Sequence, residues 1–181
     1  MGSTLPFLGG VTHGEDDQVT DPIALDLPAD VQTAIDEAHH ALTDLVAGNA
    51  DSTRETYWHA EHTTLFGAYG GCDTGWSALS RRLDAISPLV ADGGDSSSHV
   101  TVQTLAAGAS GDLAYTVELE RHVHPSTGAA AQDTADVQTL RVTQVYQRAQ
   151  GTWKLIHRHA DPLSNIQGAL AEAGWSRARS T

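Results

Sequence analysis

The sequence is poor in several residue types, and each shortage excludes a class of protein. A single cysteine, Cys72, excludes an internal disulfide and gives no sign of an oxidising compartment. Only 10 residues are basic, with Lys154 the one lysine, against 23 acidic residues, so the formal net charge is −13. A chain this acidic lacks the basic face that nucleic acid or an anionic membrane surface requires.

Long apolar runs are absent as well. No run approaches the ~20 residues of a membrane-spanning helix, and residues 1–14 lack the basic start and apolar centre of a secretion signal. We therefore expect a cytoplasmic protein with neither a nucleic acid nor a membrane as partner.

The 181 residues suit one domain with tails. Residues 1–28 contain three prolines and little hydrophobic periodicity, which predicts a flexible N-terminal arm. Residues 29–163 carry the patterns of a folded domain. Residues 164–181 are predicted to be a C-terminal tail, in which 165–175 has the composition of a short helix.

The hydrophobic period changes once within the folded part. Helical spacing covers 30–47, with Asp30 as its predicted N-cap, then 51–59, and then 74–87, where Pro88 is expected to end the helix. The segment 63–66 indicates a short strand. From residue 99 the period becomes two, which predicts an antiparallel meander of strands over 99–107, 113–124, 136–148 and 152–160. The order indicates an α+β fold with helices on one face of a strongly bent sheet.

Three stretches are similar to a known superfamily: 57–75 (YWHAEHTTLFGAYGGCDTG), 111–120 (GDLAYTVELE) and 140–162 (LRVTQVYQRAQGTWKLIHRHADP). They resemble the nuclear transport factor 2-like superfamily, in particular its SnoaL-like branch. They are also similar to the association domain of calcium/calmodulin-dependent kinase II and, more distantly, to ketosteroid isomerase. The resemblance implies a cone-shaped, mostly antiparallel sheet with three helices enclosing a pocket, commonly in a homodimer. It does not define a function, because this fold hosts several enzyme classes and non-catalytic domains.

Strand alternation and the same resemblance predict which side chains face the pocket. The candidate catalytic residues are Glu118, Glu120 and Arg158, since an arginine can hold a carboxylate or enolate oxygen while a glutamate moves a proton. Alternatively, the two glutamates lie on a solvated strand and Arg158 points outward, because one bulge would reverse the parity of a strand. The other residues expected in the pocket are Trp58, Phe66, Gln144, Tyr146 and Ile156.

Two features of the sequence suggest sites that we consider less favoured. The His-x-His pairs His122/His124 and His157/His159 would bind zinc if three imidazoles converged. Because no cysteine cluster or helical His pair accompanies them, we predict no metal and no cofactor, and keep these four as the weaker alternative. The glycine-rich segment 67–75 lacks the Gly-Lys-Ser/Thr of a phosphate-binding loop and indicates a turn.

Two functions of different classes remain open. The first is a cofactor-independent isomerase, lyase or hydrolase that acts on a small molecule, largely apolar or bearing a carboxylate. The second is a non-catalytic ligand-binding or oligomerisation domain. A homodimer is expected in either case, because the predicted outer face of the sheet is partly apolar at Leu105, Leu113, Val117 and Val145.

Overall fold

The computed structural model describes residues 26–68, 70–90, 99–124 and 136–163. The elements, in chain order, are α1 (Ala29–Val46), α2 (Asp51–Thr56), β1 (Thr64–Phe66), β2 (Cys72–Thr74), α3 (Trp76–Val90), β3 (His99–Ser110), β4 (Leu113–His124), β5 (Asp136–Ala149) and β6 (Thr152–Pro162). This order confirms the predicted α+β class. Most of the predicted arm (1–28), the whole tail (164–181) and the predicted helix over 165–175 lie outside the described residues.

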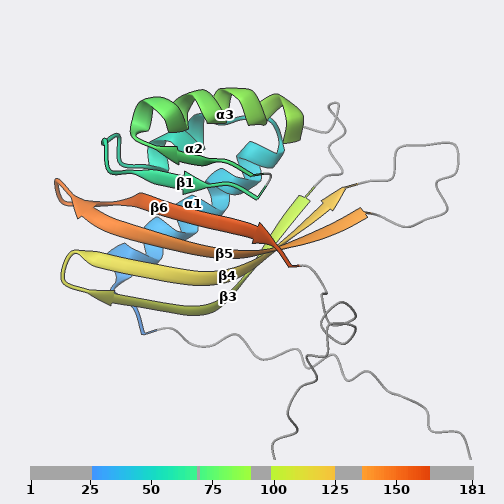
Figure 1. Cartoon of the computed structure of the whole chain (residues 1–181). Coiled ribbons are helices and arrows are strands. Elements are labelled where there is room, and N and C mark those ends of the chain that lie inside the picture. The colour runs from blue at the N-terminus through green and yellow to red at the C-terminus, as the bar shows by residue number, and fades with distance from the viewer. Residues whose placement is uncertain (1–25, 69, 91–98, 125–135, 164–181) are drawn as a thin grey trace, which may run out of the picture.

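The six strands form one strongly bent, open sheet in the order β2-β1-β6-β5-β4-β3. Strands β3 to β6 make the predicted antiparallel meander, and β1 pairs in parallel with β6. Figure 1 shows α1, α2 and α3 together on one side of this sheet. Two register shifts, at Thr104/Ala106 and at Val145/Tyr146, mark bulges that increase the local bend. In the described part of the chain, no helix has the length and apolar character needed to cross a membrane.

The helices are held by the apolar stripes that the sequence shows. Leu79 and Leu83 of α3 are fully buried, as are Val31 and Ile35 of α1. These side chains and those of Tyr146, Trp153 and Leu155 from the sheet form one core cluster. The core therefore lies between the helices and the concave face of the sheet.

Three local predictions are wrong. Asp30 is not the N-cap of α1: Pro28 takes that position, and Asp30 lies in the first turn, where its carboxylate accepts a hydrogen bond from Nε1 of Trp153 over 3.0 Å. Pro88 does not end α3, because in the last turn its missing N–H removes only one helical hydrogen bond. Strand β2 lies within the segment 67–75 that was predicted to be a turn, because three residues are too few to show a period in the sequence.

Candidate functional site

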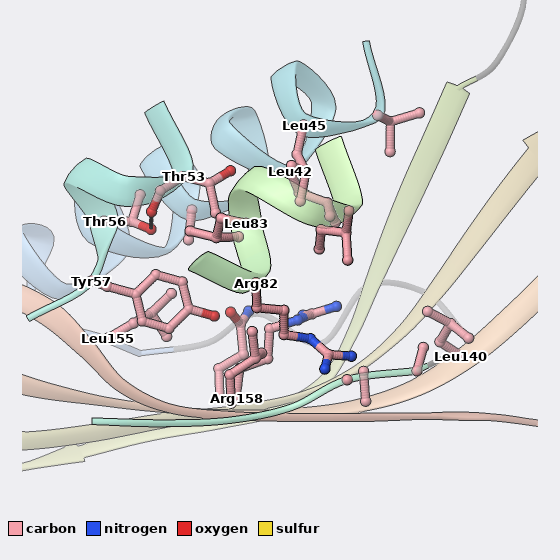
Figure 2. A pocket seen from close by; sticks show the side chains of 18 of the residues that line it. Leu42, Leu45, Thr53, Thr56, Tyr57, Arg82, Leu83, Leu140, Leu155 and Arg158 are labelled. Carbon is pink, nitrogen blue, oxygen red and sulfur yellow. Dashed lines mark hydrogen bonds between the residues drawn. The ribbon is translucent and has the colours of Figure 1, made fainter. Parts of the chain in front are cut away.

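A cavity of about 100 Å³ lies between the helices and the concave face of the sheet. Figure 2 shows Leu42, Leu45 and Leu83 reaching toward it from the helices and Arg158 rising from the sheet. Its apolar lining is Ala38, Leu42, Leu45 and Val46 of α1, Leu83 and Ile86 of α3, Leu65 of β1, Leu140 of β5, and Leu155 and Ala160 of β6, with Gly67 and Ala68 beside them. The remaining lining residues are Thr53, Thr56, Tyr57, Arg82, His122, Gln144 and Arg158. A mainly apolar cavity with a few polar groups is the usual form of a small-molecule site.

The bulge opposite Val145/Tyr146 decides which residues of β6 face the cavity. Tyr146 pairs with Leu155 and Val145 pairs with His157, so Ile156 is the extra residue between them. Arg158 therefore lies on the cavity side as predicted, but it is Leu155, not Ile156, that lines the cavity with it. An uninterrupted alternation would have put Leu155 on the opposite face from Arg158.

Two aromatic positions are also shifted by one residue. Tyr57 and Leu65 line the cavity at the places where Trp58 and Phe66 were expected. Phe66 lies on the other face of β1, where its ring meets His157 and His159 edge-on. Of the two residues predicted on β5, Gln144 lines the cavity, and Tyr146 is buried in the core behind it.

Glu120 and Arg158 come together in a buried ion pair. Two parallel hydrogen bonds of 2.7 and 2.8 Å run from Nη1 and Nη2 of Arg158 to the two carboxylate oxygens of Glu120, which is 1% exposed. Burial acts to raise the pKa of Glu120, but the charge of Arg158 and the hydrogen bonds from Arg158 and His122 lower it to about 2. Glu120 is therefore an ionised carboxylate at neutral pH.

His122 lies on the same face of β4 and is the third member of this group. Its Nε2 is 3.2 Å from Oε2 of Glu120. Because an ionised carboxylate only accepts hydrogen bonds, Nε2 of His122 donates in this contact, and Nδ1 is the ring nitrogen left for another partner. His122 lines the cavity, and it is the imidazole that the carboxylate of Glu120 orients.

Glu118 is equally buried but has different partners. Its Oε1 accepts a hydrogen bond of 2.8 Å from Nε2 of His39 on α1, and its Oε2 accepts one of 2.9 Å from Nε2 of Gln144. Burial lowers the pKa of His39, but the hydrogen bond and the charge of Glu118 outweigh it and raise that pKa above its usual value. Glu118 does not line the cavity. It lies behind Gln144 and holds the amide group of that residue.

Tyr57 adds a hydroxyl donor to the cavity. Burial raises its pKa to about 12, against the charge of Arg158, so the phenol stays protonated. Figure 2 shows the Tyr57 hydroxyl pointing along the cavity toward the region of Arg82 and Arg158.

The predicted histidine pairs do not converge. His157 and His159 lie on the face of β6 opposite Arg158, where Nδ1 of His157 is 2.7 Å from Oγ1 of Thr64, whereas His122 faces the cavity. The side chain of His124 is outside the described residues. Within the parts of the chain that are described, no three His, Cys, Asp or Glu side chains gather as a metal site.

The comparison with protein families identifies the fold. The model of the SnoaL-like domain matches residues 31–163. The chain belongs to the SnoaL-like domain family. This confirms the resemblance expected from the sequence. A search of curated proteins finds no match.

Solved structures similar to this SnoaL-like domain agree in fold. The CaMKII hub of S. rosetta is 20% identical, with a TM-score of 0.52, and the alignment covers 75% of this chain and 99% of the hub. An NTF2-like protein of unknown function from Pseudomonas putida is also 20% identical, with a TM-score of 0.53 and coverage of 76% and 87%. A superfamily protein from Salmonella enterica is 12% identical, with a TM-score of 0.52 and coverage of 83% and 94%. At these identities the likeness shows the fold alone.

Sequence reasoning found part of the polar group in this SnoaL-like domain. It named Glu118, Glu120 and Arg158, and the structure brings Glu120 and Arg158 together. It named His122 only as a metal ligand, although the same alternation that turns Glu118 and Glu120 inward also turns His122 inward. It missed His39 and Tyr57, whose contacts with the strands join segments far apart in the sequence.

Proposed function

We propose that this SnoaL-like domain binds a small, largely apolar molecule and catalyses a cofactor-independent proton transfer on it, as an isomerase or lyase does. The observation that supports this best is the His122–Glu120–Arg158 group, of which His122 and Arg158 line a mainly apolar cavity. An imidazole oriented by a buried carboxylate is suited to act as a general base or acid. An apolar wall excludes the water that would compete for the proton.

The roles are assigned to atoms that the contacts described above do not use. Nδ1 of His122 takes a proton from the substrate, and the carboxylate of Glu120 stabilises the imidazolium that forms. The electron pair left on the substrate moves onto an oxygen, to which Tyr57 Oη and the N–H groups of Arg158 not used by Glu120 donate hydrogen bonds. The imidazolium then returns the proton, either to another carbon in an isomerisation or to a departing oxygen in an elimination.

In this proposal neither glutamate is the base, which differs from the sequence-based hypothesis. Both oxygens of Glu120 are held by Arg158 and His122, and its low pKa makes it a weak proton acceptor. Both oxygens of Glu118 are held by His39 and Gln144, and Glu118 lies behind the cavity lining. Glu120 orients His122, and Glu118 positions Gln144.

A solvent-exchange experiment tests the proton transfer even while the substrate is unidentified. The protein is incubated with a cell metabolite extract in D2O, and mass spectrometry detects compounds that gain deuterium or are consumed. We expect such compounds with the wild type, and a loss of roughly 100-fold or more in rate with His122→Gln, as is typical for removal of a general base. His159→Gln is the matched control, because His159 is exposed on the other face of the sheet. Equal exchange with His122→Gln and the wild type would refute the role of His122.

The second candidate function is assembly without catalysis. It is favoured by the likeness to a CaMKII hub and by the outer face of the sheet, where Leu105, Leu113 and Tyr115 are 38, 50 and 44% exposed. We propose that a second copy of the chain covers this face.

Sedimentation at micromolar concentration is expected to show a dimer for the wild type and a monomer for Tyr115→Glu. Leu89→Glu, on the exposed surface of α3, is expected to remain dimeric. A monomeric wild type would contradict the proposed dimer.

A further inference from the structure

Arg82 brings a second guanidinium group to the cavity, and the proposed proton transfer does not use it. It comes from α3, its side chain is 17% exposed, and it lines the cavity. Its Nη1 donates a hydrogen bond of 3.0 Å to Oδ2 of Asp73, and its Nη2 donates to the carbonyl oxygen of Gly70. Figure 2 shows its side chain extending from α3 toward the sheet.

The glycine-rich segment after β1 is shaped to accept this guanidinium. A Cβ atom added at Gly67 or at Gly71 would overlap nitrogen atoms of Arg82. Gly70 and Gly71 also have φ values of +88° and +87°, a conformation that other residues rarely adopt. The glycines of this predicted turn therefore leave the space in which the guanidinium of Arg82 from α3 lies.

Arg82 keeps one buried donor that no described residue accepts. A guanidinium carries five N–H groups, of which Asp73 and Gly70 each accept one. Nε of Arg82 is buried and has no acceptor among the described residues. A buried donor without an acceptor is unfavourable, and native structures rarely keep one unless something else supplies the acceptor.

Arg82 lines the cavity, so the other lining residues indicate what its remaining N–H groups would bind there. Leu42, Leu45 and Ile86 line the same cavity and fit an apolar body. A carboxylate matches the fork of a guanidinium with two parallel hydrogen bonds. A phosphate with two negative charges would be repelled more strongly by Asp73 and by Glu120 near the cavity.

We propose that Arg82 is the carboxylate-binding group of the cavity and that the ligand is a small monocarboxylic acid with an apolar body. This proposal rests on the ligand site of the proposed function and adds the chemical class of its substrate. The carboxylate lies at Arg82, and the apolar chain extends along α1 and α3 toward His122 and Arg158.

Two isosteric probes test the charge requirement directly. Pentanoate and pentanamide have the same shape, but only the first carries a carboxylate. Chemical-shift titration of the isotope-labelled 181-residue protein measures the affinity of each. We expect pentanoate to bind the wild type about tenfold or more tightly than pentanamide, and Arg82→Gln to remove this preference. Arg81→Gln is the matched control, because Arg81 is the neighbouring residue, is exposed and does not line the cavity. Gly67→Ala keeps the charge of Arg82 but places a methyl group where its guanidinium lies. This variant is also expected to weaken pentanoate binding.

Several outcomes of these titrations would overturn the assignment of Arg82 as the carboxylate-binding group. Equal affinity for the two probes, a preference that persists in Arg82→Gln, or no saturable binding of pentanoate to the wild type overturns the assignment. If Arg82 only fastens α3 to the β1–β2 turn, Arg82→Gln lowers the thermal stability and weakens both probes alike, which also overturns it. This proposal and the proposed function can fail separately. Deuterium exchange that depends on His122 but occurs in uncharged compounds would refute only the assignment of a carboxylate-bearing ligand. Pentanoate binding without any exchange refutes only the catalysis.

Discussion

Glu118 and Glu120 lie two residues apart on the same face of β4, and each is 1% exposed, yet their surroundings differ in kind. Glu120 is bound by a guanidinium from β6 and an imidazole from its own strand. Glu118 is bound by an imidazole from α1 and an amide from β5. One glutamate is part of a fixed charge pair at the cavity, and the other joins a helix to the sheet behind it.

Burial alone therefore does not determine what each of these carboxylates does. Arg158 reaches Glu120 from β6 across the intervening strand β5, on the cavity side of the sheet. His39 reaches Glu118 because the helical stripe of α1 packs on the concave face of the sheet. The partners brought by other elements, and not the position on β4, separate the two roles.

The largest effect is expected when the charge pair at Glu120 is broken. Arg158→Met leaves a buried carboxylate without its cation, which typically costs about 3–5 kcal/mol of unfolding free energy. Urea unfolding measures the change. Arg141→Met is the control, since the Arg141–Asp161 pair is 59 and 41% exposed and is expected to contribute less than about 1 kcal/mol. Equal losses in the two variants would mean that the Glu120 pair behaves as a surface pair.

The second prediction concerns the response of Glu120 to acid. Its pKa is lowered from 4.5 to about 2 in the folded protein. Its contribution to stability is therefore fully present above pH 4.5 and is lost as the pH falls through about 2. We expect the unfolding free energy of the wild type to fall by about 2–3 kcal/mol more over this range than that of Glu120→Gln. Urea unfolding at several pH values checks this, and parallel pH profiles for the two proteins would contradict it.

Much of the fold could be predicted because its signals are local and repeated. The alternation over β3 to β6 extends through most of each strand, so the meander and the inward positions of Glu118 and Glu120 follow from it. The apolar stripe of α1 repeats often enough to define both the helix and its buried face. The short elements β1 and β2 lack such repetition, and this is why the pattern favours Phe66 where Leu65 lines the cavity, and why β2 was not expected.

The rest of the site depends on single residues and on contacts distant in sequence. The bulge at Ile156 adds one residue to β6 without any change in the alternating pattern, so the sequence does not reveal where the parity changes. His39 and Glu118 are 79 positions apart, and the exit of the chain from α2 that turns Tyr57 inward involves a bridge to Leu155. The partners of the glutamates therefore follow from tertiary packing and not from local sequence.

The smallest expected effect is the pH dependence of the contact between His39 and Glu118. The pKa of His39 is raised above 6.5 in the folded protein, so protonated His39 stabilises the fold. This contribution is present below pH 6.5 and is lost as the pH rises through the folded pKa. Unfolding free energies measured from about pH 5.5 to about pH 8 are expected to decline less with pH in His39→Gln than in the wild type. His40→Gln changes the adjacent, exposed histidine and is expected to keep the wild-type slope. If His40→Gln alters the slope and His39→Gln does not, Glu118 does not hold a charged partner, and the two glutamates differ only in the ion pair at Glu120.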